Sequence, residues 1–200
     1  MNDTIDQNNQ QKDNVNDKLN DNVNDRVYRI YCDGIFDLFH FGHAESFEQA
    51  KKAFPNVHVI VGVMSDSDTI KNKGITVMNQ EERAKSVSHC KWVDEVIMCP
   101  PWIADQAFLD KYQIDFVAHD VMSYPTGSPN DVHKYVKETG RFLETQRAKD
   151  ISTSELITRI IKNYNMYVDR NLKRGINGKD LNISFVKKCT MWIKRRFKND

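Results

Sequence analysis

The sequence predicts an α/β fold in which a parallel sheet is covered by helices on both faces, followed by a helical extension. Two observations carry this prediction. Short apolar segments alternate with amphipathic ones between residues 27 and 140, which is the pattern of repeated βαβ units. Residues 57–63, Val-His-Val-Ile-Val-Gly-Val, are mostly β-branched, as expected of a strand buried on both sides. A chain of 200 residues is long enough for one domain with a sizeable core.

The elements follow one another at the spacing that crossovers between parallel strands require. Strands are expected at residues 27–32, 57–63, 93–98 and 115–118. Helices are expected at residues 43–54, 79–90, 104–112 and 131–139. Asn79 and Glu82 form a capping-box pair that opens the second of these helices.

A long amphipathic helix is expected after the last of these elements. It should begin at Ser152 or Thr153 and end near Gly175, a residue suited to a helix C-terminus. Its apolar face consists of Leu156, Ile157, Ile160, Ile161, Tyr164, Tyr167, Val168 and Leu172.

The two ends of the chain differ in composition from the central part. Residues 1–25 are almost entirely polar, so they cannot bury enough apolar area and are expected to be disordered. Residues 187–200 mix large apolar side chains with lysines and arginines, as a surface-active helix or a solvated helix end does. We therefore expect a tail over 1–25, a domain over 26–175, and an extension over 176–200 whose basic end contacts anionic membranes weakly at most.

The bulk composition excludes several classes of protein. The formal net charge of +1 gives no general attraction to nucleic acid. The chain has no apolar stretch long enough to cross a bilayer and no apolar signal segment, so a cytoplasmic protein is expected, with the nucleus as the alternative. The four cysteines are scattered without a Cys-x-x-Cys pair, which favours free thiols over a zinc site or disulfides.

The run from Asp33 to His43, Asp-Gly-Ile-Phe-Asp-Leu-Phe-His-Phe-Gly-His, joins the first expected strand to the first expected helix. The start of a helix presents backbone N–H groups and the positive end of its dipole, which suits an anion. His40 and His43 are three residues apart and can face the same phosphate, while Gly42 allows a close approach. Two polar residues in an ordinary helix-start turn are the alternative, but the flanking strand and helix favour the anion site.

Other polar and aromatic residues also follow the expected strand ends. They are Ser65, residues 98–102 and His119. Because the carboxyl ends of parallel strands lie at one edge of a sheet, we expect these residues and His40 to meet there.

Further short segments occur in a fixed order after the histidine run. They include Val63-Met64-Ser65-Asp66, Thr76-Val77-Met78-Asn79, Phe116-Val117-Ala118-His119-Asp120, Thr145-Gln146-Arg147, Ile151-Ser152-Thr153-Ser154 and Arg170-Asn171-Leu172-Lys173-Arg174-Gly175. With the histidine run, this series resembles the catalytic domain of the CTP:phosphocholine cytidylyltransferases over residues 26–186. The resemblance implies a Rossmann-like fold of the nucleotidyltransferase type. It also implies transfer of a cytidylyl group from CTP to phosphocholine, giving CDP-choline and pyrophosphate for phosphatidylcholine synthesis.

The resemblance also implies partners and a cofactor. Mg²⁺ is expected on the triphosphate of CTP, held mainly by phosphates and water, and we assign it no protein ligands. A homodimer is expected, with Arg29-Ile30-Tyr31 matching a segment at the family's interface. Animal members of the family continue into a long membrane-sensing region, so little or no lipid regulation is expected of a chain of this length.

Residue roles follow from the same resemblance. His40, His43, Lys73 and Arg147 are expected to be catalytic, with Lys73 in a polar loop over residues 70–74 and Lys71 as the alternative lysine. The expected nucleotide contacts are Ile35, Phe36, His43, Lys73, His119, Asp120, Tyr124, Gln146, Arg147, Ile151, Ser152 and Thr153. The expected phosphocholine contacts are Asp33, Lys73, Trp102 and Tyr124.

This chain departs from the family pattern in places. The family reads Arg-Thr-Glu-Gly-Ile-Ser-Thr where residues 147–153 read Arg-Ala-Lys-Asp-Ile-Ser-Thr, which predicts weaker binding of the β- and γ-phosphates. An aromatic residue of the choline site is replaced by His133, which predicts a weaker cage, and Val121 and Ser123 replace an acidic residue and a proline.

Three other functions remain open at this point. The acceptor is phosphoethanolamine in the first. In the second, the chain is a non-catalytic or impaired homologue that binds nucleotide or membrane, as the altered residues 148–150 suggest. The third is an adenylyltransferase that uses the same histidine pair with ATP.

Overall fold

The computed structural model describes residues 26–120, 131–184, 186, 187, 189 and 190. It forms two compact units, the first ending at Ser152 and the second beginning at Thr153. The predictions made for the 1–25 tail, for Val121, Ser123 and Tyr124, and for most of the basic C-terminal end lie outside the described residues.

A five-stranded parallel sheet forms the centre of the first unit, with the strand order β3-β2-β1-β4-β5. The strands are β1 (Tyr28–Gly34), β2 (Val57–Val63), β3 (Glu95–Met98), β4 (Phe116–Asp120) and β5 (Phe142–Thr145). From β1 the chain proceeds to β2 on one side and later to β4 on the other. The carboxyl ends of β1 and β4 therefore flank the point where the strand order reverses, which is where open α/β sheets bind ligands.

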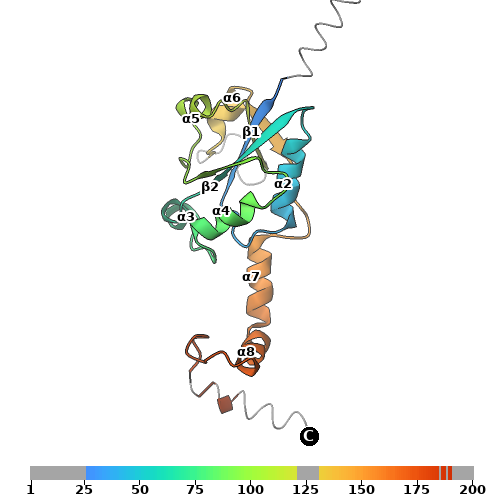
Figure 1. Ribbon diagram of the computed structural model, residues 1–200. Helices are drawn as coiled ribbons and strands as arrows, with labels where there is room; N and C mark the ends of the chain where they lie inside the picture. The colour runs from blue at the N-terminus through green and yellow to red at the C-terminus, as the bar shows by residue number, and fades with distance from the viewer. Residues whose placement is uncertain (1–25, 121–130, 185, 188, 191–200) are drawn as a thin grey trace, which may run out of the picture. The chain divides into compact units, whose positions relative to one another are not determined.

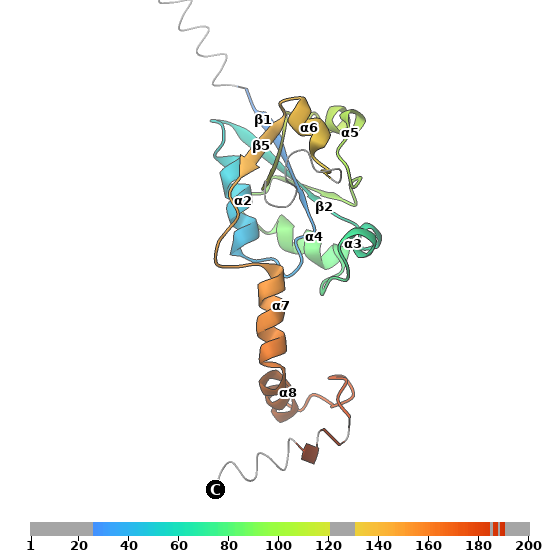
Figure 2. The ribbon, with the colours of Figure 1, turned by 180° about the vertical axis from the view of Figure 1, so that it is seen from behind.

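Helices cover both faces of this sheet, as the sequence predicts (Figures 1 and 2). Buried residues of α2 (Phe41–Lys51) and α4 (Gln80–Ser88) pack with one set of strand residues, and those of α5 (Gln106–Lys111) and α6 (Lys134–Glu138) pack with another. The first set includes Ile30, Val59 and Val61, and the second includes Tyr31, Ile60 and Val117. Successive residues of a strand thus face opposite layers, as strand geometry requires.

Two elements of the first unit were not predicted. Residues 66–72 form α3 (Asp66–Asn72), capped by Ser65, so the predicted polar loop over 70–74 is wrong in its first half and Lys73 is the C-cap of a helix. Thr69 is the buried residue of α3, so the sequence carries no apolar stripe there. The edge strand β5 was also missed because its four residues include only one fully buried side chain.

The second unit contains α7 (Thr153–Lys162) and α8 (Tyr164–Lys173), so the single long helix expected from the sequence is interrupted at Asn163. The predicted end at Gly175 is confirmed. Gly175 has a φ of 87°, its N–H donates to Leu172 O, and the Ile176 N–H donates to Asn171 O. This pair of hydrogen bonds is a Schellman motif. Val168 is buried, whereas Ile160 and Ile161 of the predicted apolar face are exposed.

No helix in the described part of the chain is long and apolar enough to cross a membrane.

Candidate active site

The turn that follows β1 has an unusual backbone. Phe36 and Leu38 have φ angles of 58° and 47°, in the left-handed region that side chains other than glycine seldom adopt. The ring of Phe36 folds back over Gly34, where an added Cβ would lie 2.7 Å from the ring. Each such residue costs on the order of 1 kcal/mol or more, and strain of this kind concentrates at functional sites.

This turn leads into the two histidines at the start of α2. His40 is the N-cap residue and His43 is the third residue of the helix, and their rings stack with centroids 3.8 Å apart. The His40 backbone N–H lies 3.4 Å from His43 Nδ1, an arrangement that leaves the proton of the His43 ring on Nε2. Both ring nitrogens of His40 are buried and have no hydrogen-bond partner in the structure as described. Because buried polar atoms are costly without a partner, this ring is suited to a ligand.

The surroundings keep both imidazoles neutral. Burial lowers the pKa of His40, and the positive charge of Arg147 lowers it further. Burial, His40 and Arg147 together lower the pKa of His43 to about 3, and Asp37 opposes this effect only in part. Near neutral pH the two rings therefore act as N–H donors without a charge of their own, and a bound polyanion would raise their pKa values.

Two contacts hold the segment around Arg147 against α2, one near the start of the helix and one near its end. An added Cβ on Gly42 would lie 2.9 Å from Ile151 Cγ2 and 3.0 Å from Ala148 Cβ, so this position needs glycine. The side-chain amide of Gln49 donates to Gln146 O at 2.9 Å and accepts from the Gln146 N–H at 2.7 Å. Residues more than 95 positions apart thus meet along the helix that begins with the histidine pair.

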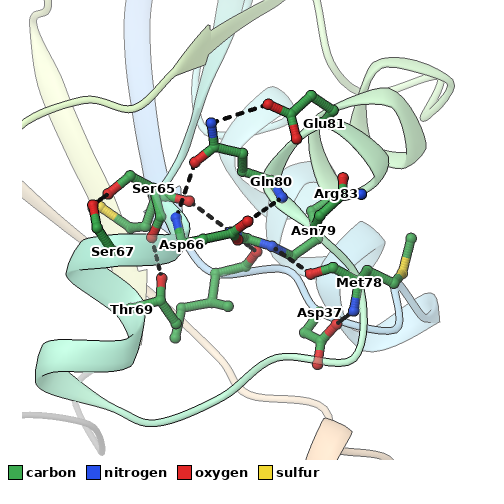
Figure 3. Close-up of polar contacts among 12 residues, drawn as sticks. Asp37, Ser65, Asp66, Ser67, Thr69, Met78, Asn79, Gln80, Glu81 and Arg83 are labelled. Atoms are coloured by element: carbon green, nitrogen blue, oxygen red, sulfur yellow. Dashed lines mark hydrogen bonds and ion pairs between the residues drawn. The ribbon is translucent and has the colours of Figure 1, made fainter.

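A third segment is tied to the same turn by Asp37. Its carboxylate accepts a hydrogen bond from the backbone N–H of Met78 at 2.9 Å (Figure 3) and another from that of Val77 at 2.8 Å. The loop that carries these groups begins directly after α3. Lys73 lies at its start with an exposed side chain, followed by Gly74 with a φ of 117°. The loop that begins with Lys73, the predicted phosphate-binding lysine, is therefore held by Asp37 to the turn that precedes the histidines.

Arg83 of α4 connects the turn after β1 with the segment after β2. Its side chain is fully buried and donates to Ile35 O at 2.6 Å, to Met64 O at 2.8 Å and to the Asp66 carboxylate at 2.6 Å (Figure 3). The guanidinium thus connects the residue after β1 with the residues after β2, and it stabilises the edge of the sheet on which the site is built.

A second cluster lies at the carboxyl ends of β1 and β4. His133 Nε2 is 3.2 Å from Asp33 Oδ1, and the His119 and His133 rings have centroids 4.5 Å apart. Burial acts to raise the pKa of Asp33, but the hydrogen bond from His133 and the charges of both histidines outweigh it, and the pKa is lowered. The side chains of Asp33 and His133 are only 13% and 5% exposed.

The remaining predicted residues are distributed as follows. Trp102 is half-buried in the loop between β3 and α5, and among the described residues no hydrogen bond or ring contact joins it to Asp33. Asp120 ends β4 beside His119, and its carbonyl oxygen lies 2.9 Å from His119 Nδ1. Ser152 ends the first unit, and Thr153 begins α7 in the second.

The sequence profile of the cytidylyltransferase-like family matches residues 31–159, which include the histidine pair and Arg147. The chain belongs to the cytidylyltransferase-like family.

Individual members of this family are similar to the chain over most of its length. It is 51% identical to the "Probable choline-phosphate cytidylyltransferase" of Schizosaccharomyces pombe over 173 residues. These residues cover 86% of this chain and 48% of that protein. It is 54% identical to "Choline-phosphate cytidylyltransferase 2" of Arabidopsis thaliana over 165 residues. These residues cover 82% of this chain and 54% of that protein. A mouse "Ethanolamine-phosphate cytidylyltransferase" is 38% identical over 136 residues, 68% of this chain and 33% of that protein. The chain thus spans about half the length of the choline-phosphate relatives.

Three residues that position this cytidylyltransferase-like site were not assigned a role from the sequence. Arg83 sits beside Ala84 on the buried side of α4, and a charged residue at a core position is a signal that could have indicated it. Asp37 is within the histidine run, but its partners Val77 and Met78 are 40 residues away. No feature of the sequence indicated the role of Gln49, because a glutamine in a helix usually faces solvent.

Proposed function

We propose that the chain transfers the cytidylyl group of CTP to phosphocholine. The names of relatives at about 50% identity support this function, and the ethanolamine-phosphate relative is more distant at 38%. The observation that carries the proposal is the stacked, neutral histidine pair, with both nitrogens of His40 buried and without a partner among the described residues, beside Arg147. Such a site provides N–H donors and a guanidinium cation for a phosphate chain.

The reaction needs no general base. A phosphate oxygen of phosphocholine is already an anion, and it attacks the α-phosphorus of CTP. A new P–O bond forms, the bond from the α-phosphorus to the oxygen that bridges to the β-phosphorus breaks, and pyrophosphate leaves. The protein has to position the two substrates and neutralise the negative charge that accumulates in the transition state.

The residues of the site divide this work. The His43 Nε2–H and the His40 ring donate to the non-bridging oxygens of the α-phosphate. Arg147 holds the departing phosphates, since a guanidinium can grip a phosphate through two N–H bonds. Lys73, on the loop anchored by Asp37, brings a flexible ammonium to the phosphates of both substrates. Asp33 supplies a carboxylate for the quaternary ammonium of choline.

The donor set beside the histidines fits Mg²⁺ that arrives on the nucleotide. Asp37, whose charge reaches His43, already accepts two backbone N–H bonds and belongs to the scaffold of the loop. Mg²⁺ would then be held by the triphosphate and water, and it would neutralise the leaving pyrophosphate. The altered residues 148–150 make this part of the site the one where affinity for CTP is expected to be reduced.

The direct test is the formation of labelled CDP-choline from CTP and labelled phosphocholine by the wild-type chain and by variants. His43→Ala should reduce the rate by about 10²–10³-fold, since it removes one donor to the transition state. Lys73→Ala should also be strongly impaired. His89→Ala, an exposed histidine at the end of α4, serves as the control and should be unaffected.

The same assay decides between the other functions. Phosphoethanolamine as the better acceptor, or ATP as the better donor, would replace the proposal by the corresponding enzyme. A folded chain without turnover and without calorimetric binding of CTP would be a non-catalytic homologue.

Two further properties belong to the same proposal. We expect a homodimer. Ile30 and Tyr31 are buried within the chain itself, so the part-exposed Arg29, which also donates to Tyr112 O and pairs with Glu95, is the residue of that segment that can reach a partner. Light scattering of wild type and Arg29→Ala tests this. Weak, salt-sensitive adsorption to anionic vesicles is expected of the basic end, and equal binding after removal of residues 187–200 would refute it.

A further inference from the structure

We propose that Asp33, His119 and His133 bind a transition-metal ion, with Zn²⁺ as the best match. These residues come from the end of β1, the end of β4 and the start of α6. One ligand atom of each lies within 4.8 Å of the other two. In a tetrahedral zinc site with Zn–N bonds of about 2.0–2.1 Å the ligand atoms lie about 3.3 Å apart. The ligand atoms therefore have to approach one another by no more than about 1.5 Å to close the site.

The surroundings of His119 are those of a metal ligand. Its Nδ1 lies 2.9 Å from the carbonyl oxygen of Asp120, so Nδ1 carries the proton and donates it. The lone pair for a metal is then on Nε2. Metal-binding histidines usually make this kind of hydrogen bond, because it fixes the tautomer and the orientation of the ring.

His133 is held in place by its own turn. Its backbone N–H donates to Asp131 Oδ1 at 3.0 Å, and Asp131 forms an ion pair with Lys137 at 2.8 Å. The side chains of Asp131 and Lys137 are 1% and 12% exposed, so this support is shielded from water. The His133 ring therefore meets Asp33 with little freedom to move, which is what a preorganised site requires.

The combination of donors selects the class of metal. Two imidazoles and one carboxylate suit Zn²⁺ with a water as the fourth ligand, whereas Mg²⁺ and Ca²⁺ prefer sites made of oxygen alone. Cu²⁺ would bind the same set more tightly in vitro. The cluster uses neither histidine of the pair 40/43, whose nitrogens serve the phosphates in the proposed reaction.

The proposal has a functional consequence that rests on the proposed function. Asp33 is the carboxylate expected to face the ammonium group of choline, so a bound metal ion and phosphocholine cannot both use it. Zn²⁺ should then inhibit the transfer in competition with phosphocholine and not with CTP. The metal site itself does not depend on this, since binding is measured without either substrate.

The test uses the full chain with Cys99→Ser as the background, because Cys99 is an exposed thiol that would bind zinc by itself. After treatment with a chelator, Zn²⁺ binding is measured by calorimetry, and Co²⁺ is added to a second sample for its visible spectrum. We expect one ion per chain and a tetrahedral Co²⁺ spectrum without the intense sulfur charge-transfer bands. His133→Gln and His119→Gln should each weaken binding at least tenfold, and the matched control His89→Gln should leave it unchanged.

Thermal unfolding separates a lost site from a lost fold. The wild-type melting temperature should rise with Zn²⁺, whereas the two variants should melt cooperatively and fail to respond. Unchanged Zn²⁺ affinity in both variants, no binding by the wild type, or sulfur ligation by the Co²⁺ spectrum would each overturn the proposal. If one variant fails to fold, the other variant and the spectrum of the wild type still decide the question. Turnover of CTP and phosphocholine by the zinc-free chain, with Mg²⁺ supplied and the chelator removed, tests the proposed function separately.

Discussion

At the scale of single residues, the site depends on close packing around Gly42, where a larger side chain would not fit. Gly42 is packed on Ile151 and Ala148, and His40 lies with its ring nitrogens buried beside it. The chemistry proposed for the site thus depends on a glycine that touches no substrate. Two predictions follow from these contacts.

Replacing Gly42 by alanine should damage the site although it improves the helix. Alanine is favoured over glycine in a helix by about 1 kcal/mol, so on propensity alone the variant would gain stability. The new methyl group instead meets Ile151 Cγ2 at 2.9 Å and His40 Nδ1 at 3.1 Å, and it should displace the Arg147 segment. We expect transfer activity to fall at least tenfold and the melting temperature not to rise. Glu45→Ala, at an exposed position of the same helix, is the control; a fully active Gly42→Ala would contradict the account.

The buried, neutral imidazole of His43 should make stability fall on acidification. Its pKa is about 3 in the folded chain against an ordinary value of 6.5, so between these values the unfolded chain binds more protons. Acid therefore favours unfolding. The protonation of His43 in the unfolded chain should lower the free energy of unfolding by about 1 kcal/mol as the pH falls from 6 to 5. Denaturant titrations at both pH values check this. His43→Asn should show the smaller pH dependence, while His89→Asn should match the wild type; equal pH dependence in His43→Asn and wild type would refute it.

At the scale of elements, the site is assembled from loops that side chains of the scaffold hold together. Arg83 connects the residues after β1 and β2, Asp37 holds the loop that follows α3, and Gln49 holds the segment after β5. The order of the strands alone would place these loops at one edge, but not in contact. The hydrogen bonds of Gln49 in α2, Arg83 in α4 and Asp37 in the turn after β1 supply the contact.

Removing the guanidinium of Arg83 should therefore loosen several loops at once. In Arg83→Gln the carbonyl oxygens of Ile35 and Met64 lose a charged donor in a buried place. A buried carbonyl oxygen left without its donor typically costs about 1–3 kcal/mol. Loss of the ion pair with the part-exposed Asp66 adds less than about 1 kcal/mol. Denaturant unfolding measures the loss. Lys85→Gln, exposed on the same helix, should change stability by less than about 0.5 kcal/mol, and an equal effect of the two substitutions would show that Arg83 is not a support.

At the scale of the whole molecule, the two units differ in how much side chain they bury. β2 is buried along nearly its whole length, whereas α7 has no buried residue and α8 has one, Val168. Local stability follows buried apolar contact, so the units should open independently. Amide hydrogen exchange should be slowest in β1 and β2 and much faster in α7. Equal protection of α7 and β2 in the chain alone would contradict this expectation.

Much of this architecture could be predicted from the sequence, and the failures have physical causes. The strand 57–63 is predicted to the residue because its β-branched run has no competing interpretation. The strand-end argument brings His40 and His119 to one edge of the sheet. It could not show that Gly42 accommodates Ile151, that His133 meets Asp33, or that Asn163 interrupts the C-terminal helix. These features depend on distant contacts or on a local break that apolar periodicity does not record.

The neutrality of the stacked imidazoles has a consequence for the heat of nucleotide binding. A triphosphate that settles against His40 and His43 raises their affinity for protons, so in mildly acidic solution the complex takes up hydrogen ions from the buffer as it forms. The enthalpy recorded by calorimetry should then vary with the ionisation enthalpy of the buffer chosen, and this variation should disappear toward alkaline solution. Nucleotide affinity and acidity are thereby linked through two rings that carry no charge before the ligand arrives.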